Sequence, residues 1–248
     1  MKVLIISDVH SNFRALEALE KQEKTWDKLL FVGDAVDFGF QPHECLTWLR
    51  EHGALCVQGN HDEGFLCRLN EGFRSMELDK TEHFWQHNLS LMTDRDIEFL
   101  RSFPVERIVG IDGITYCMMH IYQHEYGDDN ALNHQMKDYN VVDRAEKYWR
   151  EKVGVTGGKR VFLVGDSHRC GLLQLRKDLI ALNPGSLAYR LGADTYYKGG
   201  DYIVVEDGIP YFRFVSYDTA EDYADICARP FTGHDKNAGM AIFRPENR

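Results

Sequence analysis

Short apolar runs alternate with amphipathic stretches over the first 60 residues of the chain. Runs typical of buried strands lie at 2–7, 29–32 and 54–57. Between these runs, apolar side chains recur at helical spacing over 12–24 and 43–52. The strand, helix, strand, helix, strand order predicts neighbouring parallel strands joined by crossover helices.

The rest of the chain predicts short helices and antiparallel strand pairs. Residues 63–103 carry helical patches, which we place over the sheet or beside the mouth of a site, and Asp112-Gly113 predicts a hairpin between 105–109 and 114–119. Further along, the sequence predicts a polar loop at 127–138, a helix at 141–153 and a strand at 161–164. Two antiparallel strand pairs follow, at 170–176 with 179–182 and at 202–205 with 210–215. The pairs indicate a second sheet packed on the first. From about residue 216 the pattern weakens, and we expect one short helix near 219–228 followed by an irregular tail.

Composition narrows the class of protein. With 248 residues, 44% of them hydrophobic and 27% charged, the chain can bury a core as one domain spanning 1–248. A net charge of −10 provides no basic field for a nucleic-acid backbone. No apolar run approaches the roughly 18–20 residues of a membrane span, and the run before Asp8 is too short for a signal peptide, so we expect a soluble, cytoplasmic protein. Six cysteines without a Cys-x-x-Cys pair argue against a zinc ribbon or a disulfide framework.

Five of the predicted strands end in side chains that can bind metal ions. These side chains are Asp8 and His10, Asp34, Asn60 and His61, His120, and Asp166 and His168. Ligands at the mouths of buried strands are how α/β folds build sites. Asp34 is the centre of this pattern, because a carboxylate has two oxygens and can hold two hard cations at once. A simpler interpretation of the first pair, in which Asp8 caps the next helix and His10 is incidental, is weakened by the other four clusters.

The order of these motifs resembles the five motifs of the calcineurin-like metallophosphoesterases. The matching segments are Asp8-Val9-His10, Gly33-Asp34-Ala35-Val36-Asp37, Gly59-Asn60-His61-Asp62, His120 and Gly165-Asp166-Ser167-His168, with Asn183-Pro184-Gly185-Ser186 at the end of the match. Within that family the chain resembles the small prokaryotic phosphodiesterase-like branch. The resemblance implies an α/β fold, an αββα sandwich of two packed mixed sheets flanked by helices, with a dinuclear metal site at the carboxyl edge of the strands.

Carried over residue by residue, the resemblance implies two ligand sets that share Asp34. The first set is completed by Asp8, His10 and His168, and the second by Asn60, His120 and Asp166. Two ions held in this way can share a hydroxide, lower its pKa and neutralise a phosphoryl oxygen during in-line attack. Mn²⁺ is the favoured ion, with Fe, Ni, Zn or Mg as further candidates.

His61 and Asp62 are the predicted catalytic residues. His61 would act as a general acid or phosphate donor, and Asp62 could fix the tautomer and orientation of its ring. The alternative for His61 is a buried structural histidine.

One ligand departs from the family pattern. The last motif of the family reads Gly-His-x-His, and Asp166 stands here where the first His is expected. Our hypothesis is that this carboxylate still binds the second ion and shifts the preference toward harder ions such as Mn²⁺, Fe²⁺ or Mg²⁺. The rival is a weakened or empty second site, assisted by His124.

Two other departures argue against a Ser/Thr protein phosphatase. That branch has arginines after motif two and before motif three, whereas Phe38 follows Asp37 here and Gln58 precedes Gly59. Asn12 is a candidate substrate contact or, equally, the N-cap of the first helix. Two interpretations stay open for five further residues, which could form a substrate-binding rim or be ordinary surface residues. They are Tyr122, Arg169, Tyr189, Arg190 and Lys198.

The expected function is metal-dependent hydrolysis of phosphodiesters or small phosphorylated metabolites by a two-metal, bridging-hydroxide mechanism. The alternative within the enzymes is a dinucleoside tetraphosphate hydrolase, and outside them a non-catalytic scaffold of the same fold. An intact His61 weighs against the scaffold, because among the ligands only residue 166 has changed. The expected partner is a small phosphorylated substrate, without nucleic acid or membrane, and the oligomeric state stays open.

Overall fold

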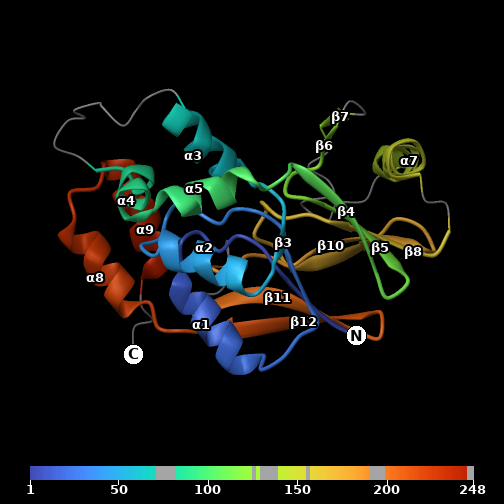
Figure 1. Ribbon diagram of the computed structural model, residues 1–248, viewed down its shortest axis with the longest axis horizontal. Helices are drawn as coiled ribbons and strands as arrows, with labels where there is room; N and C mark the ends of the chain where they lie inside the picture. Colours follow the sequence, from blue (N-terminus) through green and yellow to red (C-terminus); the bar gives the residue numbers. More distant parts are fainter. Residues whose placement is uncertain (71–81, 125–126, 129–138, 155–156, 190–198, 245–248) are drawn as a thin grey trace.

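Two five-stranded mixed sheets pack face to face in the part of the chain that the structure describes, with helices on their outer faces (Figure 1). The structure is a computed structural model, and it describes residues 1–248 except 71–81, 125–126, 129–138, 155–156, 190–198 and 245–248. This αββα sandwich confirms the fold class that the sequence predicts.

The first sheet combines three parallel strands with an antiparallel pair. Its order is β12-β11-β1-β2-β3, with bounds Ile209–Ser216, Gly199–Glu206, Lys2–Ile6, Lys28–Phe31 and Leu55–Cys56. β1, β2 and β3 run parallel, so their carboxyl ends meet at one edge of the sheet. The pair β11–β12 adds to this sheet along β1. The prediction that this pair belongs to the second sheet is wrong, because a hairpin pattern does not encode which sheet edge the hairpin will join.

The second sheet contains the other two antiparallel pairs, as predicted. Its order is β4-β5-β8-β10-β9, with bounds Glu106–Ile111, Ile114–Met119, Lys159–Leu163, Leu179–Asn183 and Gly171–Gln174. β5, β8 and β10 are parallel. The short strand β6 (Gln123–His124) pairs with β7 (Gly127–Asp128), which lies at the start of the loop predicted at 127–138. Residues 129–138 of that loop lie outside the described residues.

Eight α-helices in the described residues surround the sheets. They are α1 (Phe13–Gln22), α2 (Pro42–Glu51), α3 (Asn60–Asn70), α4 (Phe84–Leu91), α5 (Asp94–Arg101), α7 (Tyr139–Tyr148, continued by a π-helical turn at Trp149–Val153), α8 (Ala220–Ala228) and α9 (Gly233–Phe243). Pro42 opens α2, where a missing N–H costs nothing. The irregular tail predicted after residue 228 is wrong, because α9 forms there. Thr232 caps this helix by accepting a hydrogen bond from the Asp235 amide at 3.2 Å.

Alternating apolar side chains along β1 account for the layers. Val3 and Ile5 belong to the apolar cluster between the two sheets. Leu4 and Ile6 belong to the cluster on the other face, where they pack with Leu16 of α1. α7 covers the outer face of the second sheet with a third cluster. Because the central strands β1 and β8 have apolar clusters on both faces, polar side chains can gather at the ends of these strands.

Glu23, at the end of α1, is expected to make folding stability depend on pH. Its buried carboxylate accepts hydrogen bonds from the Lys2 ammonium and the Tyr202 hydroxyl, both at 2.7 Å. Burial alone would raise the pKa of Glu23, but these two contacts hold it below the ordinary value of 4.5. Since the folded pKa is the lower one, this stabilisation is present at neutral pH and is lost as the pH falls below 4.5 through the folded pKa. Glu23→Gln should lower the free energy of unfolding by about 1–2 kcal/mol at pH 7 and by much less at pH 3, as measured by urea titration. Equal losses at both pH values would contradict this.

Candidate metal centre

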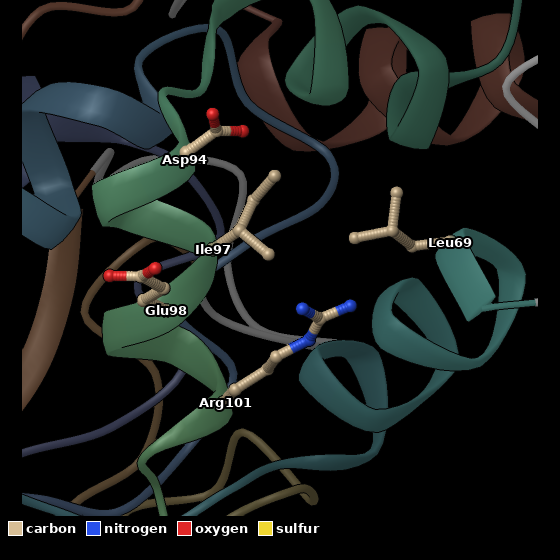
Figure 2. A pocket seen from close by; sticks show the side chains of 5 residues that line it. All are labelled: Leu69, Asp94, Ile97, Glu98 and Arg101. Atoms are coloured by element: carbon tan, nitrogen blue, oxygen red, sulfur yellow. The ribbon is translucent and has the colours of Figure 1, made fainter.

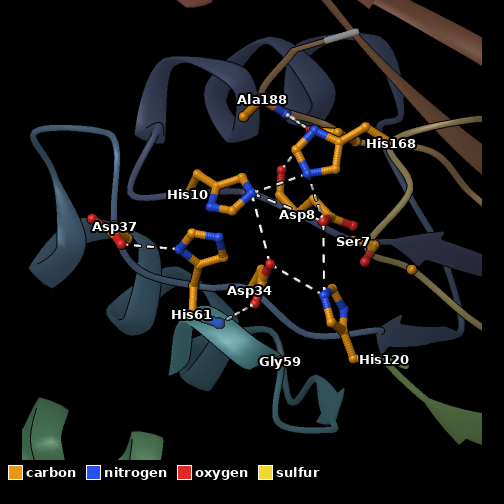
Figure 3. A network of polar contacts seen from close by, with 12 residues as sticks. Ser7, Asp8, His10, Asp34, Asp37, Gly59, His61, His120, His168 and Ala188 are labelled. Carbon is orange, nitrogen blue, oxygen red and sulfur yellow. Dashed lines mark hydrogen bonds and ion pairs between the residues drawn. The ribbon is translucent and has the colours of Figure 1, made fainter. Parts of the chain in front are cut away.

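Side chains from four strand ends converge at the carboxyl edge of the two sheets (Figure 3). They are Asp8 and His10 after β1, Asp34 after β2, His120 after β5 and His168 after β8. Their ligand atoms fall into groups in which all atoms lie within 4.8 Å of one another, namely Asp8 with His10 and His168, Asp8 with Asp34 and His120, and His10 with Asp34 and His61. The structure thus brings together five of the seven predicted metal ligands, with the predicted catalytic His61 beside them.

The converging side chains are buried and close to one another. Nε2 of His168 lies 3.0 Å from Oδ1 of Asp8 and 3.3 Å from Nε2 of His10. On the other side, Nε2 of His120 lies 3.1 Å from Oδ2 of Asp34. None of these five residues is more than 7% exposed.

The tautomers of two histidines are fixed by backbone carbonyls. Nδ1–H of His120 donates to the Val32 carbonyl at 2.5 Å, and Nδ1–H of His10 donates more weakly to the Val36 carbonyl at 3.4 Å. A carbonyl can only accept, so Nδ1 must carry a proton in both rings, and Nε2 is the nitrogen that faces the cluster. A hydrogen bond of this kind on the outer nitrogen is usual for histidines that bind metals.

These residues fit divalent ions. Neither carboxylate oxygen of the fully buried Asp8 accepts a hydrogen bond from the described residues, and buried polar atoms without a partner are costly. Two atoms that bind one ion at about 2.1 Å at right angles lie about 3 Å apart. The spacings of 3.0 Å and 3.3 Å around His168 match that requirement. Imidazole with carboxylate is a donor set for Mn, Fe, Ni or Zn ions.

Opposed effects of burial and charge set the pKa values of the cluster. Burial lowers the pKa of His10 to about 4, so this ring is neutral and can act as a ligand. Burial also disfavours the charged form of His120, but Asp34 and Asp8 outweigh it and raise the pKa of His120 to about 10. Burial opposes ionisation of Asp34, while His120 holds the pKa of this carboxyl well below its usual range. Asp34 is therefore a carboxylate at neutral pH.

His61 is oriented by Asp37, and the predicted orienting role of Asp62 is wrong. Nδ1 of His61 lies 2.9 Å from Oδ2 of Asp37 (Figure 3), and its backbone amide donates to Oδ1 of Asp34 at 2.9 Å. Burial lowers the pKa of His61, but the hydrogen bond that its ring donates to Asp37 and the charge of Asp34 raise it to about 9. The ring is thus protonated at neutral pH. The centroid of the His61 ring lies 4.8 Å from that of the Phe38 ring.

Asp62 ties two loops of the site together through their backbone amides. Its fully buried carboxylate accepts hydrogen bonds from four N–H groups, those of Asp34 at 3.0 Å, Ala35 at 2.8 Å, Val36 at 3.2 Å and Gly59 at 2.9 Å. The role was missed because backbone amides leave no trace in a sequence pattern.

The site is built on strained backbone. Eight of the ten non-glycine residues with positive φ in the described chain lie here, at Asp8, His10, Ser11, Asp34, Asp37, Phe38, Asp166 and His168. Such conformations are uncommon for residues with a side chain and gather at functional sites. Close approach is also required at Gly59, where a Cβ atom would come within 2.0 Å of Oδ1 of Asp34.

The remaining predicted ligands lie at the margin of the cluster. Asn60 is exposed at the first residue of α3. Asp166 is half-buried and is absent from the close ligand groups. Burial and the charges of Asp8 and Asp34 raise its pKa, while His120 and His168 lower it, so it lies within electrostatic range of the cluster. The side chain of His124, invoked as a substitute ligand, lies outside the described part of the chain.

The predicted substrate contacts differ in their exposure, since Asn12 and Tyr122 are buried and Arg169 is exposed. Asn12 is 1% exposed, caps α1 by accepting from the Ala15 amide at 3.3 Å and donates to the Tyr217 hydroxyl at 3.0 Å, which supports the alternative helix-cap interpretation. Tyr122 is buried in the core beside Phe162, so its placement at the mouth is wrong. Although Tyr122 follows a strand, its ring packs among apolar side chains and does not reach the site. Arg169 is exposed next to His168. Arg190 and Lys198 lie outside the described residues.

Asn88 is a site-organising residue that the sequence did not reveal. This fully buried residue of α4 accepts from the Ser11 hydroxyl at 2.5 Å and the Asp37 amide at 2.9 Å, and donates to the Gly39 carbonyl at 2.9 Å. It therefore fixes the loop that carries Asp37. An asparagine within a helical pattern gives no sign of such a role.

A separate cavity lies between α5 and the end of α3 (Figure 2). Its volume is about 370 Å³, and it is lined by Leu69, Asp94, Ile97, Glu98 and Arg101. The Arg101 guanidinium donates a hydrogen bond to Oδ1 of Asn70 at 3.0 Å, and the carboxylates of Asp94 and Glu98 also line the cavity. This charge does not suit a phosphorylated ligand, and none of the lining residues belongs to the metal centre.

An αββα sandwich with buried carboxylates and histidines at its strand ends defines a metal-binding class of protein. The sequence model described as "Calcineurin-like phosphoesterase superfamily domain" matches residues 1–205. The chain therefore belongs to the calcineurin-like phosphoesterase superfamily, as the motifs predicted. Residues beyond the match include α8 and α9, which pack on α4 in an apolar cluster that contains Phe84, Phe231 and Phe243.

Individual proteins resemble this chain in part of the sequence or in the fold. A curated protein of Methanocaldococcus jannaschii, "Uncharacterized protein MJ0912", is 39% identical over 66 residues, which are 26% of this chain and only 27% of the relative. A solved metallophosphoesterase from Sphaerobacter thermophilus has a TM-score of 0.68 at 20% identity and covers 97% of this chain and 98% of its own. Hypothetical protein PH1004 from Pyrococcus horikoshii has a TM-score of 0.69 at 14% identity, with 99% of both chains covered. Both structures show the shared fold.

Membrane insertion through helices has no support in the described chain. None of its helices combines the length and apolar character needed to cross a bilayer.

Proposed function

We propose that this protein hydrolyses phosphodiesters or small phosphorylated metabolites with two divalent metal ions. The observation that best supports this is the convergence of two carboxylates and three imidazoles, from Asp8, Asp34, His10, His120 and His168. Bound ions would neutralise charge on the phosphoryl oxygens and lower the pKa of a water molecule. Mn²⁺ is the first candidate, because the mixed carboxylate and imidazole set suits it.

Asp34 is the side chain proposed to serve both ions. Its two oxygens have different neighbours, since Oδ1 accepts from the His61 amide at 2.9 Å while Oδ2 lies 3.1 Å from Nε2 of His120. Asp8, His10 and His168 would complete one ligand set. Asn60, His120 and Asp166 would complete the other.

His61 is proposed to supply the proton of the reaction. In hydrolysis the water oxygen bonds to phosphorus, the ester P–O bond breaks and the departing oxygen needs a proton. His61 meets this need because Asp37 holds Nδ1 and the raised pKa of about 9 keeps the ring protonated at neutral pH. Arg169, exposed beside His168, is the basic side chain proposed to meet the substrate.

A substrate panel tests this proposal. The panel holds aryl monoesters, aryl diesters, cyclic nucleotides and dinucleoside polyphosphates, each with Mn²⁺, Ni²⁺ or Mg²⁺. We expect metal-dependent diester cleavage that stops with a chelator, and a loss of about 10²–10⁴-fold in His61→Asn. His234→Asn, at an exposed histidine, is the matched control and should keep full activity. If the wild type cleaves nothing in the panel, the non-catalytic scaffold becomes the better account. If dinucleoside polyphosphates are the preferred substrates, the dinucleoside tetraphosphate hydrolase becomes the better account.

A further inference from the structure

Two aromatic side chains border the histidines of the metal centre. The ring centroid of Phe38 lies 4.8 Å from that of His61 and 5.3 Å from that of His10. The ring of Tyr189 lies 4.5 Å from His168 and 5.8 Å from His10. Both side chains are partly exposed. They come from distant parts of the chain, the loop after β2 and the segment after β10.

The position of Phe38 is fixed at a cost in backbone strain. Its φ is +60°, in the left-handed region that a bulky residue rarely adopts. Asn88 holds the chain on both sides of it, through the Asp37 amide and the Gly39 carbonyl, and the ring also packs on Phe84 at 5.7 Å. An asparagine or glycine would take this backbone conformation with less strain. The strained position has the effect of placing a ring beside His61.

The position of Tyr189 is fixed by the end of β1. Its amide donates to Oγ of Ser186 at 3.2 Å, and the hydroxyl of Ser186 donates to the Asp8 carbonyl at 2.9 Å. The Ala188 amide also donates to the Asp8 carbonyl, at 3.1 Å. The backbone at Tyr189 is thus tied to the same turn that carries Asp8 and His10, while the Tyr189 hydroxyl makes no hydrogen bond within the described residues.

The charges of the cluster suit a single phosphoryl group. Among the described residues, the ion pairs of the cluster join histidines to carboxylates, and no lysine or arginine takes part. The proposed ions, His61 and Arg169 would neutralise one phosphoryl group, and the ion pairs of the described cluster add no lysine or arginine for further phosphates. A planar aromatic group would instead meet ring surfaces, and base–aromatic stacking contributes strongly to binding.

We propose that Phe38 and Tyr189 form an aromatic rim that binds a flat substituent of the substrate. The inference rests on the proposed phosphoesterase function and refines it, since it assigns the substrate to monoanionic phosphodiesters that carry an aryl or nucleoside group. These two residues determine specificity, and the metal ligands and His61 remain responsible for cleavage.

Binding of two phosphonates tests the rim without relying on turnover. Phenylphosphonate and methylphosphonate share a head group and differ in the flat ring, and calorimetry with Mn²⁺ present gives the Kd of each. We expect the wild type to bind phenylphosphonate about tenfold more tightly, within the range that stacking supplies. Phe38→Leu and Tyr189→Leu should each reduce this preference severalfold, and Tyr189→Phe, which keeps the ring, should retain it. Tyr211→Leu, at an exposed tyrosine on β12, is the matched control.

A parallel kinetic series separates failure of the rim from failure of the proposed function. Methyl, phenyl and thymidine esters of p-nitrophenyl phosphate share one leaving group, and the ratio of their kcat/KM values reports the second substituent. Higher values for the phenyl and thymidine esters, lost in both leucine variants, support the rim, and the thymidine arm separates nucleoside from simple aryl recognition. Equal kcat/KM values, or equal Kd values for the two phosphonates, would overturn the rim while leaving the phosphodiesterase intact. No turnover of any ester would instead overturn the proposed function, and with it the rim.

Discussion

Asp34→Asn is expected to lower kcat/KM for a cleavable phosphodiester roughly a thousandfold. This factor corresponds to a loss of about 4 kcal/mol of transition-state stabilisation. Asparagine keeps the shape of the side chain, so its carbonyl oxygen can still accept from the His61 amide. It loses the negative charge, and only one of its two terminal atoms can bind a metal. If Asp34 serves both ions, both sites weaken together. The measurement is kcat/KM together with metal content by elemental analysis after dialysis.

Asp166→Ala is the comparison that gives this result its meaning. Asp166 is half-buried at the margin of the cluster, so its removal should affect the second ion and leave the first bound. We expect Asp34→Asn to lose both ions and Asp166→Ala to lose one. Unchanged metal content and turnover in Asp166→Ala would favour the rival hypothesis, in which residue 166 binds no ion. Full metal content in Asp34→Asn would contradict the shared role of Asp34.

The strand ends were readable from the sequence because burial and chemistry change there abruptly. Apolar runs that stop at an Asp or His mark the edge of a sheet, and parallel strands then bring those residues together. This reasoning predicted a cluster of Asp8, His10, Asp34, His120 and His168, and the structure brings these side chains together. It failed for Tyr122, which also follows a strand. The Tyr122 ring packs in the apolar cluster on the outer face of the second sheet and not at the site.

Contacts made through the backbone and between distant segments were not readable. Asp37 and Asp62 both lie in the predicted motifs, and nothing in the residue types says that Asp37 contacts the His61 ring while Asp62 accepts hydrogen bonds from backbone amides. Asn88 lies in a helix without a motif. The same limit explains the β11–β12 pair, whose alternation predicts a hairpin but not its neighbour β1, and α9, whose weak amphipathic pattern is compensated by packing on Phe84 and Ile226.

Asp62→Ala is expected to cause the largest loss of stability among single substitutions at this site. The carboxylate is 0% exposed and accepts from four amides that belong to two different loops. A buried N–H that loses its acceptor costs about 1–3 kcal/mol. Water entering the space left by the side chain can satisfy some of the four, so we expect a loss of about 3–5 kcal/mol in the free energy of unfolding. That is a large fraction of the roughly 5–15 kcal/mol that stabilises a typical domain.

Urea unfolding in the presence of a chelator measures this loss without a contribution from bound metal, which would otherwise stabilise the wild type by mass action. The free energy of unfolding of Asp62→Asn should lie between those of the wild type and Asp62→Ala. One oxygen can still accept from the amides of Ala35 and Val36. The new NH₂ group would face the amides of Asp34 and Gly59, which cannot accept. Asp143→Ala is the matched control, since it removes an aspartate whose ion pair with Arg176 is exposed, and such pairs contribute about 0–1 kcal/mol. A loss no greater than that of the control would mean that the four amides do not depend on Asp62. The loops that carry Asp34 and His61 would then be held by their own backbone geometry.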